Sequence, residues 1–74
     1  MSKQELPMFK RRIKMLYAES GLGAYVFARH IGTTYDTFRR WCLGKRIPGA
    51  ISLYNVCKAC NVSADWLLGL SDRR

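Results

Sequence analysis

The chain has 74 residues and a mass of 8.5 kDa, enough for one small domain but too little for a scaffold that also holds an enzyme cleft. Lys and Arg number 13 against 5 Asp and Glu, giving a formal net charge of +8, yet 49% of the residues are apolar. This apolar content excludes a disordered polycation, because such tails lack the side chains whose burial offsets chain entropy. We therefore expect a single basic domain over residues 1–74, with short flexible ends at 1–6 and 71–74.

No segment predicts a membrane span or an export signal. The longest uncharged apolar stretch, residues 47–57, contains Pro48 and Gly49 and is far shorter than the ~20 apolar residues that a span needs. The first residues, MSKQELPMFKRR, have no apolar core typical of a signal peptide. We expect a cytoplasmic protein that does not associate with a membrane.

The residues that could support metal, redox or catalytic chemistry are few. Cys57 and Cys60 form a C-x-x-C pattern, but a zinc site needs four ligands and the chain adds only Cys42 and His30. We interpret the cysteines as small apolar residues on a helix and His30 as a polar surface residue. One histidine, five scattered acids and no glycine-rich phosphate loop leave no catalytic constellation. We expect no enzyme activity, metal, cofactor or small-molecule ligand.

The pattern of caps and apolar residues predicts helices throughout. Pro7 suits a first helical turn, Thr34 and Ser63 suit N-caps, and glycines follow several apolar stretches. Apolar residues recur at helical spacing, and no strand pattern of useful length appears. The sequence therefore predicts a compact all-α bundle of about five short helices, over residues 7–20, 24–31, 35–43, 50–60 and 64 to about 68.

Residues 24–43, AYVFARHIGTTYDTFRRWCL, have the pattern of two helices that meet steeply across a short turn. Such a pair needs a small residue at the crossing, a glycine at the bend and large apolar residues facing inward. Ala28, Gly32, Phe38 and Trp41 meet these needs at suitable offsets. Taken alone, this segment also fits any two amphipathic helices joined by a glycine.

A longer set of spacings extends this motif over residues 9–72. It comprises Ile13 and Leu16, Gly21-Leu22, Ala28-x-x-x-Gly32, Phe38-x-x-Trp41-x-x-Gly44-x-x-x-Pro48, Leu53-x-x-Val56, Val62-Ser63-x-Asp65 and Leu67-Leu68-Gly69. In these residues the chain resembles the phage Cro and lambda-repressor-like helix-turn-helix DNA-binding family. The resemblance implies a lambda-repressor-like bundle of phage, prophage or host origin that binds double-stranded DNA and regulates transcription, with repression the expected outcome.

Three features depart from the family pattern. Gly23-Ala24 stands where the family usually has Ser-Gln, so a side-chain phosphate contact often made there is missing. Thr33 replaces the usual apolar residue after the turn glycine. Tyr17 and Cys42 stand where many members pair an arginine with a glutamate; since both partners are replaced together, no uncompensated buried charge remains.

The resemblance implies that helix 35–43 enters the major groove and reads base edges from its outward face. The outward residues are Tyr35, Asp36, Arg39 and Arg40, and the two arginines are the first candidates because arginine can donate two hydrogen bonds to guanine. Asp36 either accepts from cytosine or only complements the helix dipole. Tyr35 is similarly open between a thymine-methyl contact and a backbone contact.

Phosphate contacts would position the domain without reading sequence. Four cations lie between residues 39 and 46 with no acid among them. The candidate phosphate contacts are Thr33, Thr34, Thr37, Lys45 and Arg46. For the earlier cations Lys10, Arg11, Arg12 and Lys14 a solvated helix face is the favoured interpretation.

Proteins of this kind commonly bind two half-sites as a dimer, so we expect a homodimer formed by the bundle itself. The candidate surface is Ile51, Tyr54, Trp66 and Leu70, although Trp66 and Leu70 equally fit the completion of a small core. The alternative function is a protein-interaction module, such as an antitoxin or adaptor with a helix-turn-helix fold.

Overall fold

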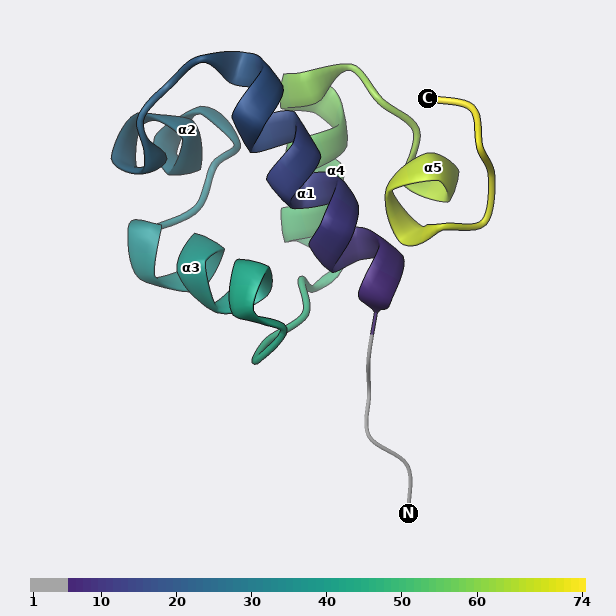
Figure 1. The fold of residues 1–74 in the computed structure, drawn as a ribbon, viewed down its shortest axis with the longest axis horizontal. Coiled ribbons are helices and arrows are strands. Elements are labelled where there is room, and N and C mark those ends of the chain that lie inside the picture. The colour runs from purple at the N-terminus through teal and green to yellow at the C-terminus, as the bar shows by residue number, and fades with distance from the viewer. Residues whose placement is uncertain (1–5) are drawn as a thin grey trace.

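The computed structural model describes residues 6–74, so most of the expected flexible N-terminal end, residues 1–5, lies outside the described part. The described part is an all-α bundle, as predicted (Figure 1). Its five helices are α1 (Pro7–Ser20), α2 (Ala24–His30), α3 (Tyr35–Leu43), α4 (Ala50–Cys60) and α5 (Ala64–Leu68).

Most helix ends lie where the capping residues predicted them. The hydroxyls of Thr34 and Ser63 accept hydrogen bonds from the backbone N–H of Thr37 and Trp66, which satisfies donors that the first turn of a helix leaves open. Helix α2 ends at His30, one residue earlier than expected, because Ile31 is the C-cap and its φ of −87° and ψ of 5° leave the helical conformation. The predicted bounds of the other helices are confirmed.

Helix α1 is central to the bundle. It contacts α2 and α3 on one side and α5 on the other (Figure 1). Its inward residues Phe9, Ile13 and Leu16 are buried, as their i, i+4, i+7 spacing predicts. The central position of α1 means that one helix holds α3 and the C-terminal segment in fixed places.

Tyr17 of α1 packs among aromatic side chains of the core. Its ring lies 5.5 Å from that of Phe27 and 5.4 Å from that of Phe38, and the latter two rings are 5.3 Å apart. Aromatic pairs at such separations stabilise a core beyond the area they bury. Cys42 packs against the same core. Tyr17 and Cys42 are thus both packed against the apolar core.

The C-terminal end packs against the body of the fold, although the sequence predicts a short flexible segment at 71–74. The backbone N–H of Ser63 donates to the carbonyl of Arg74 at 2.7 Å, and the Arg74 guanidinium pairs with Glu19 of α1. From the other side, Arg12 donates to the carbonyls of Trp66 and Ser71. These long-range bonds hold the segment after α5 against α1.

Trp66 lies beneath this segment and is 4% exposed. The guanidinium groups of Arg12 and Arg74 lie 4.8 Å and 4.7 Å from its ring centroid, within the range of cation–π attraction. Of the two interpretations of Trp66, completion of the core is the one the structure shows, and its place on an exposed dimer surface is corrected. The physical reason is that the two arginines and the returning chain cover the ring.

Within residues 6–74, no helix combines the length and apolar character that crossing a bilayer requires.

Candidate nucleic-acid interface

Helices α2 and α3 meet across a short turn that requires glycine. Gly32 has φ +83°, and a Cβ placed on it would lie 3.3 Å from Nδ2 of Asn55, so a side chain there would be strained and crowded. The backbone N–H of Thr33 donates to the Ala28 carbonyl at 2.9 Å and closes the turn. Ala28 itself is fully buried, which lets the two helices approach closely, as the motif predicts.

Helix α3 has one buried face and one exposed face. Phe38 and Trp41 are 3% and 1% exposed and anchor the helix in the core. Asp36, Arg39 and Arg40 lie on the opposite, exposed side, so both predicted arginines project away from the bundle. About half of each guanidinium-bearing side chain is accessible, 47% in both cases. The helix thus presents polar side chains on a support fixed by two large aromatic anchors.

Asp36 bridges the two arginines, a contact that the sequence interpretation missed. Its Oδ2 accepts from Nε of Arg40 at 2.9 Å, and its Oδ1 accepts from Nη2 of Arg39 at 3.3 Å. The hydrogen bond from Arg40, followed by that from Arg39, lowers the pKa of the Asp36 carboxyl below its ordinary value. Spacings of i+3 and i+4 from an acid on one helix are the signal that could have found this bridge.

The bridge leaves the two guanidinium groups unequally free. Arg40 is held through Nε, so both of its terminal nitrogens, Nη1 and Nη2, remain available as a two-donor edge. Arg39 is held through Nη2, one of the two nitrogens that form that edge. Asp36 therefore orients Arg40 and leaves both of its terminal nitrogens free to donate hydrogen bonds. Arg39 must first release its bond to Asp36 before both of its terminal nitrogens can donate.

Tyr35 is stacked on Tyr25 at the start of the two helices. The ring centroids are 4.3 Å apart with an interplanar angle of 17°. Tyr35 is half-buried by this contact, while Tyr25 is 69% exposed. The sequence interpretation did not include Tyr25, since nothing local indicates that residues ten positions apart are stacked.

The candidate phosphate-contact residues lie at both ends of α3. At its start, Thr34 is exposed and its hydroxyl is bonded to both the N–H and the hydroxyl of Thr37, so these groups already have partners. Thr33 and Thr37 are half-buried. At the other end, Lys45 and Arg46 are exposed directly after the Gly44 cap, which has φ 76°. Lys45 and Arg46 are the two cations of the predicted set, and both are exposed.

The remaining candidate dimer residues are exposed. Ile51 and Tyr54 of α4 are 78% and 59% exposed, and Leu70 after α5 is 75% exposed. When large apolar side chains that are this exposed lie together, they are candidates for contact with another molecule. Ile51 and Tyr54 are three residues apart on one helix and therefore share a face.

The cysteines and the histidine are the residues that the sequence analysis considered for metal or redox chemistry. Burial raises the pKa of the three half-buried thiols, Cys42, Cys57 and Cys60, so all three are protonated at neutral pH. Across residues 6–74, no three His, Cys, Asp or Glu side chains are grouped so as to hold a metal ion. His30 is exposed on α2.

No protein-family model matches the sequence, and neither curated proteins nor solved structures show significant similarity to it. Support for a function therefore comes from the geometry of α2, α3 and the cations around them.

Proposed function

We propose that the chain is a sequence-specific regulator that binds double-stranded DNA by placing α3 in the major groove. The observation that carries the proposal is that α3 has one buried and one exposed face. Phe38 and Trp41 are anchored in the core, and Arg39 and Arg40 are exposed on the other side. A helix is about 10–12 Å across with its side chains, and the major groove is about 12 Å wide. The helix thus matches the groove in size and offers it the side chain most often used to read guanine.

Arg40 is the principal reader in this proposal. Asp36 holds its Nε at 2.9 Å, so the side chain is oriented before DNA arrives and loses less conformational freedom on binding. Its two terminal nitrogens can then donate to O6 and N7 of one guanine. The carboxylate of Asp36 also repels nearby phosphates, which favours the arrangement in which α3 contacts bases.

The surrounding charge supports a polyanionic partner. The whole sequence has a formal net charge of +8, and Lys45 and Arg46 follow α3 directly on the exposed surface. Such cations bind phosphates and thereby fix the orientation of the reading helix. Contact with phosphates also gives the complex a strong dependence on salt concentration.

We further propose that the regulator acts as a homodimer on an inverted repeat, because one short reading helix contacts few bases. The exposed face of α4 with Ile51 and Tyr54 supplies apolar area for a two-fold contact. Leu70 is the third exposed candidate.

Selection of duplexes from a random pool, followed by binding of the enriched sequence across a salt series, tests the function. We expect enrichment of an inverted repeat whose half-sites lie about one helical turn apart. Binding without any enriched sequence would refute a specific regulator. Capture of a protein partner that persists after both Arg39→Ala and Arg40→Ala, together with no enrichment, would favour the protein-interaction module instead.

A further inference from the structure

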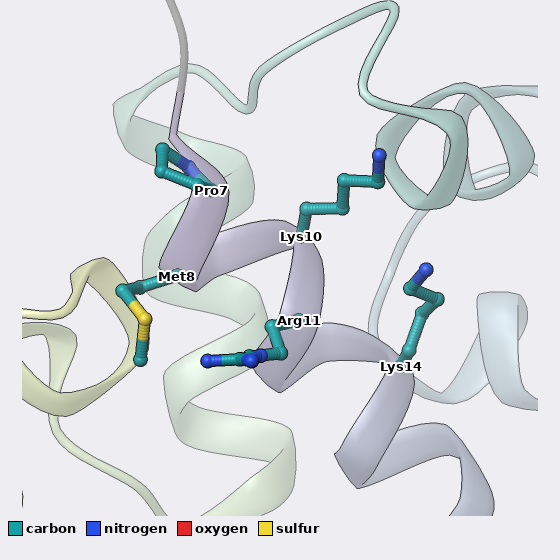
Figure 2. Close-up of a pocket in the computed structure, with 5 residues that line it drawn as sticks. All are labelled: Pro7, Met8, Lys10, Arg11 and Lys14. Atoms are coloured by element: carbon teal, nitrogen blue, oxygen red, sulfur yellow. The ribbon is translucent and has the colours of Figure 1, made fainter.

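Helix α1 carries a group of cations on the side that borders the end of α3. Lys10, Arg11 and Lys14 line an open hollow of about 450 Å³ together with Pro7 and Met8 (Figure 2). Figure 2 shows the side chains of Lys10 and Lys14 directed to the same side of α1, while Arg11 and Met8 are directed to the other side. The four-residue spacing of the two lysines stacks them on one helix face.

This lysine pair lies next to the C-terminal end of α3. A Cβ placed on Gly44 would be 3.4 Å from both Cδ and Nζ of Lys10, so the lysine side chain lies directly against the cap of α3. The charge of Lys14 acts on Cys42 of α3, where it partly offsets the effect of burial on the thiol pKa. The two lysines therefore border the cap from which Lys45 and Arg46 extend.

The cap has a hollow of its own. Gly44, Lys45, Arg46 and Ile47 line an open space of about 260 Å³. The cations of α1 and those of the cap are thus brought together from segments about thirty residues apart in sequence. Among the residues described, no carboxylate forms an ion pair with any of Lys10, Lys14, Lys45 or Arg46.

The carboxylates of the described chain lie elsewhere. Glu19 pairs with Arg74, and Asp72 pairs with Arg12 at 3.6 Å, both at the C-terminal segment. Asp65 is in the first turn of α5. Asp36 is occupied by the arginines of α3. Among residues 6–74, no carboxylate is therefore paired with the cations on the side of α1 that faces the α3 cap.

We infer that Lys10 and Lys14 form, with Lys45 and Arg46, a phosphate-binding cradle that holds the DNA backbone beyond the bases read by α3. We define this cradle by those four residues. Two lysines four residues apart on a helix are separated by about 6 Å along its axis, and each DNA strand carries one phosphate per about 3.4 Å of duplex axis. The pair can therefore contact about two phosphates of one strand.

A nucleic-acid backbone fits this surface better than other anions because the cradle adjoins the exposed face of α3. A polyanion bound to the exposed face of α3 would lie next to Lys45 and Arg46 just past its end, and Lys10 packs against the Gly44 cap from which they extend. The cradle thus rests on the proposed function, which it extends from the motif to α1.

The test compares two double variants with the same change of charge. Lys10→Gln with Lys14→Gln removes half of the cradle. Arg11→Gln with Arg73→Gln removes two exposed cations outside it, since Arg11 is directed to the other side of α1. Affinity for the selected duplex is measured by fluorescence anisotropy from about 50 to about 200 mM salt. Each lost phosphate contact reduces the steepness of the log–log salt dependence by about 0.9.

We expect the cradle variant to lose about 1.8 from this slope for each bound subunit, or about 3.6 for the homodimer on its inverted repeat, so that its affinity deficit relative to the unmodified protein shrinks by about 150-fold between the two salt concentrations. The sequence preference is expected to stay the same, because phosphate contacts do not read bases. The control variant is expected to keep the original slope.

A slope that equals that of the control overturns the cradle. The cradle is also overturned if its variant only melts at a lower temperature, since Lys10 would then merely complement the negative end of the α3 dipole. These results differ from failure of the proposed function, which would appear as the absence of an enriched sequence for the unmodified protein.

Discussion

Substitution of Arg40 by alanine separates base reading from phosphate binding. Arg40 is held by Asp36 at 2.9 Å through Nε and keeps its terminal nitrogens free, so one bidentate contact with guanine is at stake. Such a contact discriminates against the wrong base by about 1–3 kcal/mol, which corresponds to about 5- to 150-fold in relative affinity. We expect Arg40→Ala to lose this discrimination at one position of each half-site while other positions keep theirs.

The assay measures anisotropy with the selected duplex and with duplexes in which the candidate guanine is replaced. Lys45→Ala is the matched control, because it removes the same charge from an exposed residue just past the end of α3. This control should reduce the salt slope by about 0.9 for each bound subunit, or about 1.8 for the homodimer, and weaken all duplexes equally. Arg40→Ala should do the reverse, with little change of slope and a strong change of preference.

Equal weakening of every duplex by Arg40→Ala would refute the assignment of Arg40 as a base reader. It would mean that its guanidinium contacts phosphate, and that Asp36 serves only to pair the arginines. Retention of full discrimination would likewise contradict the proposal and would leave Arg39 and Tyr35 as the candidate readers.

Three further outcomes are expected. Arg12→Met should destabilise the fold by about 3 kcal/mol, because it removes a charged hydrogen bond and the cation–π contact with Trp66. The thermal unfolding midpoint should fall by about 12–24 °C. The control Arg11→Met, at an exposed residue, should change this midpoint little. The two arginine partners lower the pKa of the Asp36 carboxyl below its ordinary value of 3.8. The stability that this pairing provides is therefore present above that ordinary pKa and is lost as the pH falls through the lower pKa of the folded state. Asp36→Asn should lose less stability than the unmodified protein on acidification to about pH 3, measured by circular dichroism, and identical acid profiles of the two proteins would contradict this. Ile51→Ser should leave the monomer folded but raise the dimer dissociation constant at least about tenfold in sedimentation experiments. The reason is that each copy loses apolar area buried in the dimer contact. An unchanged dissociation constant would exclude this face of α4 as the dimer contact.

Several parts of the fold could be predicted because they depend on neighbouring residues. Thr34 and Ser63 cap helices through hydroxyl contacts only three residues away, and an α-helix places side chains three and four apart on one face. The burial of Phe38 and Trp41 opposite Arg39 and Arg40 followed from the same period. The outward face of α3 was therefore visible in the sequence.

Other parts depended on contacts between distant segments. The attachment of residues 71–74 joins Arg12 and Glu19 to the opposite end of the chain, and no local pattern indicates such a contact. The stack of Tyr25 on Tyr35 depends on how α2 and α3 cross. The bridge from Asp36 to the two arginines is an intermediate case. The sequence shows the spacing of the three residues along the helix, but it does not show the side-chain rotamers that bring them into contact.

The sequence by itself determined the helices, their caps and the exposed face of α3, because hydrogen bonding and side-chain period within a helix are set by residues a few positions apart. The tertiary structure alone decided that Trp66 is covered, that the C-terminal end is held, and that Lys10 reaches the cap of α3. These features arise where the packing of large side chains around α1 fixes the distances between helices. That packing is a property of the whole core, and no short stretch of sequence specifies it.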